Sequence, residues 1–257
     1  EYAKVEGAKY PHVQQKYSWD CGLACAEMVL KARGIHDIEF SDLHEVCRTK
    51  SVWTIDLAYL MRNYGIEARY YTTSMGVREE YKKQAFYQKH LKEDAVRVQT
   101  LFDMAQETGV NVVCRSVSNE WLKALVERNR ALVIVLVDKR LLHCVLCNRS
   151  GHIFVNSLTR LHPGFIGHYV LICGYHADSD SFLIKDPAMS RNACMVKSKN
   201  LENARRAFGT DEDLLCLGKV TSGQNMLLQA ANMLPSNNNH DTLHWDDPED
   251  DGQATIL

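Results

Sequence analysis

Cysteine, histidine and aspartate occur in this chain at positions that favour nucleophilic chemistry. Cys21 lies in "QQKYSWDCGLACAEM", where a polar stretch changes to an apolar helical pattern. The nucleophile is the thiolate, and a free thiol with a pKa of about 8.5 is mostly protonated at neutral pH. Unpaired N–H groups and aligned peptide dipoles at a helix N-terminus favour the charged form. Cys21 is therefore a candidate nucleophile, and Asp20 is expected to cap its helix.

An activated cysteine needs an imidazole to take its proton and a third group to orient that ring. Among the eleven histidines, His168 opens the apolar stretch "HYVLICGY". The chain then turns through "HADSDS" and returns along "FLIKDP", which predicts an antiparallel hairpin. The hairpin is expected to bring Asp186 beside His168. Considered alone, a histidine at the end of a strand and an aspartate at the start of a turn would each be assigned a structural role.

Gln15 is a candidate donor to the oxyanion that forms when a carbonyl is attacked. It lies on the loop that enters the helix, six positions before Cys21. Its amide and the backbone N–H of Cys21 can point at the same place. Trp19 and Trp53 are candidates for the walls of a substrate groove, although packing at a helix entrance explains large aromatics equally well.

Periodicity indicates the elements that must position these residues. Small and apolar residues at helical spacing predict a helix that starts at Cys21 and ends at Gly34. Further helices are expected at 41–48, 54–64, 118–129 and 200–209. Strands are expected at 66–73, 110–117, 131–137 and 213–220, besides the hairpin. This order predicts an α+β fold, with a helical first half and an antiparallel sheet in the second half.

Two segments lie outside that pattern. Residues 78–108 alternate in charge and are expected to form a solvated helical face, with an apolar stripe at Val96, Leu101, Met104 and Ala105. Together with residues 139–166 they are extra material that could cover or reshape a cleft.

Composition narrows the function classes. A net charge of −2 over 257 residues gives no long-range attraction for nucleic acid or an anionic membrane. The longest apolar runs, 131–137 and 169–175, are far shorter than the roughly 20 residues that span a bilayer. Residues 1–220 are expected to form one catalytic domain. Residues 221–257, which contain no lysine or arginine, are expected to be a largely disordered acidic tail.

The nine cysteines indicate a reducing compartment, because an odd number at irregular spacings in a chain of this size is not a disulfide framework. We therefore expect reduced thiols in a cytoplasmic or nuclear protein. Cys144 and Cys147 form a C-x-x-C pair in an apolar run, which favours two core thiols. A metal site that adds His143 is the alternative.

Jointly, "QKYSWDCGLAC", "GHYVLICGY" and "IKDPA" resemble the C39-like group of papain-like cysteine peptidases. The resemblance implies a papain-like fold with Cys21 as nucleophile, His168 as general base and acid, Asp186 as the residue that orients His168, and Gln15 as oxyanion donor. It also implies a hydrolase that needs no cofactor and acts on a peptide, isopeptide or related acyl bond of a peptide or protein substrate.

A longer resemblance covers most of residues 10 to 219. "WDCGLAC", "SVWTIDLAYLMRNYGI", "GHYVLICGY" and "ARRAFGTDEDLL" are similar to the family of guanylyl cyclase domain-containing protein 1 and its plant relatives. That name implies formation of cyclic GMP from GTP, which usually needs a divalent metal held by carboxylates.

The cyclase interpretation has candidate residues of its own. Asp211, Glu212 and Asp213 are possible metal carboxylates, and Arg69 is a possible phosphate cation. A charged turn and a half-exposed strand explain them equally well, and the sequence has no glycine-rich phosphate loop. We therefore favour the cysteine hydrolase. The cyclase and a non-catalytic peptide-binding module on the same fold are the alternatives.

Overall fold

The computed structural model describes residues 10–83, 85–88, 91–127, 131–145, 147 and 164–218. The chain divides into two units, Glu1–Lys219 and Val220–Leu257, and the fold below is that of the first unit. The expected tail at 221–257 and most of the 139–166 segment lie outside the described residues. No helix in the described part of the chain has the length and apolar character to cross a membrane.

Three helices near the N-terminus form one layer: α1 (Cys21–Ala32), α2 (Phe40–Cys47) and α3 (Thr54–Asn63). They match three of the predicted helices. The first ten residues of α1 are all buried, because the helix packs on α2 and α3 and on the sheet. Gly22 permits a close approach, since a Cβ there would lie 3.1 Å from the ring of Tyr169.

The sheet has seven strands in the order β2-β1-β7-β3-β4-β5-β6. Their bounds are β1 Ala68–Thr72, β2 Asn111–Cys114, β3 Ala131–Asp138, β4 Gly167–His176, β5 Ser181–Lys185, β6 Cys194–Lys197 and β7 Leu214–Gly218. All neighbours pair antiparallel except β1 and β2, which come from the first half of the chain and pair in parallel. The strand β6 was not predicted.

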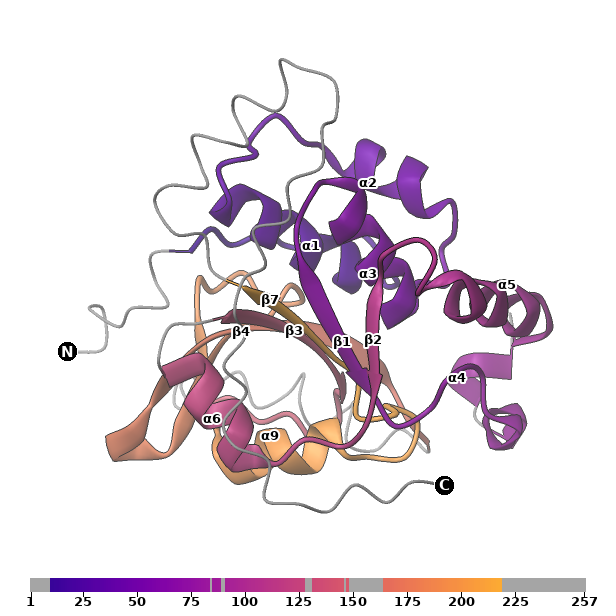
Figure 1. Cartoon of the computed structure of the whole chain (residues 1–257). Coiled ribbons are helices and arrows are strands. Elements are labelled where there is room, and N and C mark those ends of the chain that lie inside the picture. Colours follow the sequence, from indigo (N-terminus) through magenta and orange to yellow (C-terminus); the bar gives the residue numbers. More distant parts are fainter. Residues whose placement is uncertain are drawn as a thin grey trace. The chain divides into compact units, whose positions relative to one another are not determined.

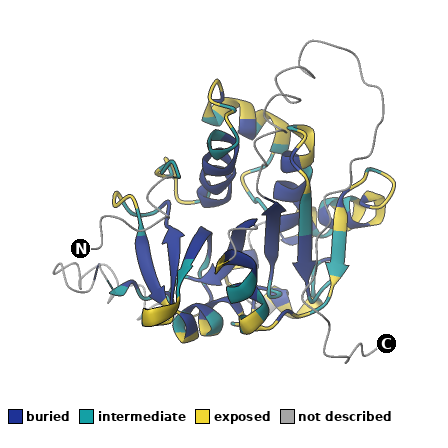
Figure 2. Ribbon diagram, turned by 60° about the vertical axis from the view of Figure 1, so that its left-hand side comes forward, coloured by how far each residue is buried: buried dark blue, intermediate teal, exposed yellow. Residues whose placement is uncertain are grey.

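Helices cover both faces of the sheet. The helices α1 and α3 lie on one face, and α6 (Asn119–Glu127) and α9 (Ser198–Arg205) lie on the other (Figure 1). The strands β3, β5 and β7, none of which lies at an edge of the sheet, are consequently buried at every residue and show no polar alternation. Figure 2 shows the sheet mostly in the dark blue of buried residues. The predicted α+β class is confirmed.

The apolar stripe predicted for residues 78–108 is confirmed at two of its four positions, because Ala105 is buried and Leu101 packs against the core. It is wrong at Val96 and Met104, which are exposed. The segment forms a 3₁₀ turn η3 (Glu79–Lys83) and two helices, α4 (Ala85–Gln88) and α5 (Leu91–Met104). Within α5, Val96 is 72% exposed, and Val98 and Phe102 are buried instead. The core-facing side of this segment therefore keeps Leu101 and Ala105 but continues through Val98 and Phe102.

The same segment is also more than a solvated face, because it carries an aromatic cluster. Tyr81, Tyr87 and Leu91 are buried together with Phe165, and Trp53 packs against them. This cluster brings α4 close to the start of β4, where a Cβ on Gly167 would lie 2.7 Å from the ring of Phe86.

Candidate active site

Cys21 is the first residue of α1 and is 7% exposed. Its Sγ accepts a hydrogen bond from the backbone N–H of Tyr169 over 3.5 Å. Burial opposes ionisation, but the hydrogen bond and charge of His168, with the N–H groups of Tyr169 and Gly22, lower the pKa of Cys21 below its usual value. The sulfur is therefore held in surroundings that favour the thiolate.

His168 and Asp186 meet through the β4–β5 hairpin, in which Leu171 lies opposite Lys185. The Nε2 atom of His168 lies 2.8 Å from Oδ1 of Asp186, and both side chains are buried. Because Asp186 occupies Nε2, Nδ1 is the ring nitrogen that remains for Cys21. The sequence-predicted trio of Cys21, His168 and Asp186 thus comes together in space.

In this trio, each charged side chain stabilises the charged form of its neighbour. Burial alone would lower the pKa of His168, but the charge and hydrogen bond of Asp186, with those of Cys21, raise it to about 9. Burial alone would raise the pKa of Asp186, but His168 and the backbone N–H of Ala188 lower it below its usual value. Together these shifts stabilise an imidazolium between a thiolate and a carboxylate at neutral pH.

Gln15 is anchored beside the trio through its backbone. Its N–H donates to the carbonyl of Pro187, next to Asp186, over 2.9 Å. Its side-chain Nε2 donates to the carbonyl of Tyr17 over 2.6 Å, which leaves one further amide N–H. Among the described residues, the amide makes no hydrogen bond to Cys21 or His168, so its oxyanion role stays a prediction.

Asp20 occupies the N-cap position of α1, but its side chain makes no capping bond to the helix. The buried carboxylate instead accepts from the backbone N–H groups of Lys16 and Tyr17 over 2.9 and 3.0 Å. Asp20 therefore holds the loop that carries Gln15, and the predicted cap on the first turn of the helix is wrong.

A pocket of about 360 Å³ opens at Cys21. Trp19 and Trp53, the two candidate wall residues, both line it and also pack against the core. Phe86 and Tyr87 of α4 complete an aromatic wall, and Lys50 is the one basic side chain that lines the pocket among the described residues. The segment 78–108 thus reaches the cleft and narrows it.

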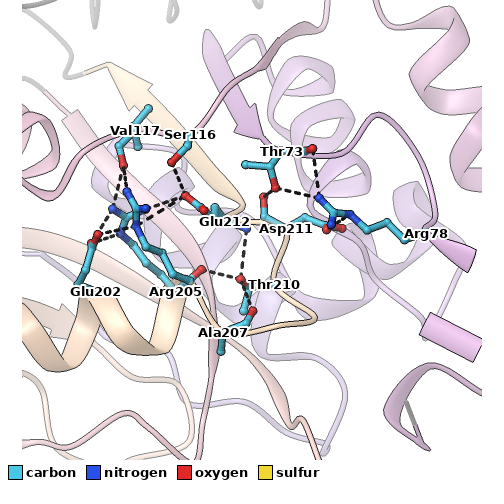
Figure 3. A network of polar contacts seen from close by, with 11 residues as sticks. Thr73, Arg78, Ser116, Val117, Glu202, Arg205, Ala207, Thr210, Asp211 and Glu212 are labelled. Carbon is cyan, nitrogen blue, oxygen red and sulfur yellow. Dashed lines mark hydrogen bonds and ion pairs between the residues drawn. The ribbon is translucent and has the colours of Figure 1, made fainter. Parts of the chain in front are cut away.

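The candidate metal carboxylates Asp211 and Glu212 face different partners (Figure 3). Asp211 forms an ion pair with Arg78 over 3.0 Å, while its backbone carbonyl accepts from Thr73. Glu212 accepts a hydrogen bond from Ser116 over 2.6 Å and lies near the buried Arg205. Each carboxylate ties the turn before β7 to a different element.

Asp213 faces a third set of partners. Its Oδ2 accepts from the Thr54 hydroxyl over 2.6 Å, and that hydroxyl lies 2.9 Å from the Tyr169 hydroxyl. Burial and the charge of Asp211 raise the pKa of Asp213 to about 7. Arg69, the candidate phosphate cation, lies on β1 between Asn111 and Cys216 of the neighbouring strands. Each residue named for the cyclase interpretation therefore has a structural role in the fold.

Three contributors to the site were not predicted from the sequence. They are the backbone N–H of Tyr169, the loop-holding role of Asp20, and the aromatic wall from α4. Only the last had a visible signal, since Phe86 and Tyr87 form an aromatic pair in an otherwise charged segment.

Comparisons with known proteins find one structural likeness, one sequence relative and one family. A Bacillus anthracis crystal structure described as a C39-like peptidase aligns with 84% of this chain and 97% of its own, with a TM-score of 0.43 and 13% identity. "Guanylyl cyclase 1" of Arabidopsis thaliana is 46% identical over 209 residues, which are 80% of this chain and 74% of that protein. The family model described as guanylylate cyclase matches residues 10–217. The chain therefore belongs to the guanylylate cyclase family.

Proposed function

We propose that this chain is a cysteine-dependent hydrolase that cleaves an acyl bond in a peptide or protein. The observation that carries the proposal is the Cys21 thiol at the N-terminus of α1, with a lowered pKa, beside a buried His168 that is hydrogen-bonded to Asp186. A nucleophile, a base and an orienting group in this relation form the unit that covalent acyl transfer requires.

The mechanism follows from the charges. The Cys21 thiolate attacks the carbonyl carbon, and the oxyanion accepts hydrogen bonds from the Cys21 N–H and from the Gln15 amide. His168 gives its Nδ1 proton to the leaving amine as the C–N bond breaks, which leaves an acyl-thioester. A water molecule then loses a proton to His168 and attacks the thioester, releasing the acid and restoring the thiolate. Asp186 orients the His168 ring in every step, and no step uses a cofactor.

The pocket favours a substrate with an apolar side chain next to the cleaved bond. Its walls are aromatic, and a pocket of about 360 Å³ is at the small end of ligand sites. Lys50 is an exposed lining residue, with Nζ 6.0 Å from the centroid of the Trp19 ring. We therefore expect a peptide or isopeptide bond in a narrow, partly extended segment.

Labelling with a peptidyl electrophile tests the proposal. At about pH 6, where an ordinary thiol is almost wholly protonated, Cys21 should react far faster than free cysteine. The Cys21→Ala variant should lose this labelling, and Cys25→Ala should keep it. Cys25 is the matched control because it lies one turn along α1, and burial with the charges of Cys21 and Asp186 raises its pKa well above the usual value. A Cys21 rate no higher than that of free cysteine would contradict the proposal.

The name of the Arabidopsis relative supports a second candidate, formation of cyclic GMP from GTP. The same variants separate the two functions. If the purified chain makes cyclic GMP and Cys21→Ala makes it equally well, the cyclase is supported and the hydrolase is not. If the chain binds peptides but Cys21 shows no activated reactivity, the non-catalytic module is supported.

Asp20→Ala is expected to separate oxyanion stabilisation from thiol activation. Without the carboxylate, Lys16 and Tyr17 lose their acceptor and the loop that carries Gln15 loosens. Acylation by a p-nitrophenyl ester, which forms an oxyanion, should slow by about 100-fold. Alkylation by iodoacetamide, which forms none, should keep its rate. Stopped-flow comparison of the two reagents makes the measurement.

Asp20→Asn is the control for that experiment, since it keeps one acceptor oxygen and should slow acylation less than Asp20→Ala does. An equal loss with both reagents would mean that Asp20 supports the thiol rather than the loop.

A further inference from the structure

Three buried thiols that play no part in the proposed mechanism meet where β6 begins. Cys144 and Cys147 follow β3 along the chain, and Cys194 is the first residue of β6. Their sulfur atoms all lie within 4.8 Å of one another. Over the residues that the structure describes, this is the one such group of three or more potential metal ligands. The third member is Cys194, and not His143 as in the alternative that the sequence suggested.

The spacing of the sulfurs suits a thiophilic cation. The Cys147 and Cys194 sulfurs are 3.8 Å apart. With Zn–S bonds of about 2.3 Å, a tetrahedral zinc ion holds neighbouring sulfurs about 3.8 Å apart. A disulfide requires about 2.05 Å between the sulfurs, so its formation would need the two strands of chain to move closer.

The surrounding backbone holds the cysteines of this cluster in place. The Cys147 N–H donates to the Cys144 sulfur over 3.4 Å, and the backbone of Cys144 bridges to Val196 of β6. These backbone contacts fix the segment after β3 against β6, so the three sulfurs are already close together without an ion.

We propose that Cys144, Cys147 and Cys194 form a binding site for Zn²⁺. The three sulfurs fill three positions of a tetrahedron, and an exchangeable solvent ligand fills the fourth. On binding, each thiol gives its proton to water. Three thiolates and one Zn²⁺ leave one net negative charge, and Arg191 is a cation near Cys147 that reduces it in part.

The site has a structural role that is independent of the proposed hydrolase. A bound ion joins the segment after β3 to the first residue of β6. Between β5 and β6 lies the loop 186–193, which begins with Asp186 and also contains Pro187, the acceptor for Gln15. Zinc is therefore expected to stabilise the fold by binding the native state alone.

Metal titration of the full chain tests the proposal. The chain is reduced, stripped with a chelator, and titrated with Co²⁺ and then Zn²⁺. We expect one equivalent of Co²⁺ with a thiolate-to-cobalt charge-transfer band and tetrahedral d–d bands, displacement by Zn²⁺, and a higher thermal midpoint with Zn²⁺. Cys194→Ser should weaken binding by more than the roughly 10- to 100-fold that loss of an outer-sphere partner costs.

Cys216→Ser is the matched control and should bind metal as the wild type does. Cys216 is a buried thiol on β7, which three strands separate from β6. If Cys194→Ser does not fold, zinc protection of the wild-type thiols from alkylation, mapped by mass spectrometry, replaces it. The proposal is overturned if the reduced chain takes up no equivalent of metal, if Cys194→Ser binds unchanged, or if zinc protects none of the three cysteines. A Cys147–Cys194 disulfide in a chain that binds no metal after reduction would also overturn it.

Discussion

Replacing His168 with alanine is expected to slow alkylation of Cys21 at neutral pH by about 10²- to 10⁴-fold. Burial of Cys21 opposes its ionisation, and the hydrogen bond and charge of His168 do most to overcome this effect. Without the imidazole, the pKa of Cys21 should rise above that of an ordinary thiol, and the rate should recover only at alkaline pH. Iodoacetamide alkylation followed across the pH range measures this shift.

The matched control for His168→Ala is His176→Ala. His176 is the last residue of β4, so it lies on the same strand at the opposite end. It should leave the alkylation profile unchanged. Equal profiles for His168→Ala and the wild type would mean that the helix N-terminus alone activates Cys21.

The same histidine links stability to pH. Its pKa is raised from 6.5 to about 9 in the folded chain. Its interactions therefore contribute fully below about 6.5, and their contribution is lost as the pH rises through about 9. The population of protonated His168, which the proposed mechanism needs, and the stability of this region thus both decrease over the same alkaline pH range.

Asp186→Asn is expected to move the alkaline limit of activity downward, with the rate kept on the acid side of neutrality and reduced above it. The carboxylate charge is the main cause of the raised pKa of His168, so its loss should return that pKa from about 9 toward 6.5. The Ala188 N–H donates to the same Oδ1 atom that contacts Nε2 of His168. An asparagine should therefore place its carbonyl oxygen there, accept from both groups, and preserve the tautomer that leaves Nδ1 for Cys21.

Measurement of the acylation rate against pH tests this prediction. The descending limb should shift by more than one pH unit in Asp186→Asn, while Asp186→Ala should lose rate at every pH because the ring is no longer oriented. If Asp186→Asn instead lost about 10⁴-fold at every pH, as expected for a ring held in the wrong tautomer, the proposed orientation by Ala188 would be wrong.

Local signals made much of this fold predictable. The helix of Cys21, the helix that begins at Thr54 and the hairpin of His168 each have a clear period and a turn or cap at the end. The hairpin mattered most, because its turn fixes the register, and the register places Asp186 near His168.

Features that depend on tertiary contacts were not predictable in the same way. The strand β6 is four residues long and pairs only at the sheet edge, so it has little periodicity of its own. The Asp20 carboxylate could accept hydrogen bonds from the N–H groups of the helix that follows it or of the loop that precedes it. The local sequence does not decide between these two sets of donors. The meeting of Cys194 with Cys144 and Cys147 joins residues about fifty positions apart, which the spacing of neither segment indicates.

The turn before β7 has a consequence for the interpretation of inherited variants. Asp211, Glu212 and Asp213 hold that turn to three different parts of the fold. A substitution at any of them would reduce the amount of folded protein in a cell before it changed any chemistry. Such an allele would behave as temperature-sensitive, with activity restored on cooling, whereas an allele that removed a catalytic group would be inactive at every temperature.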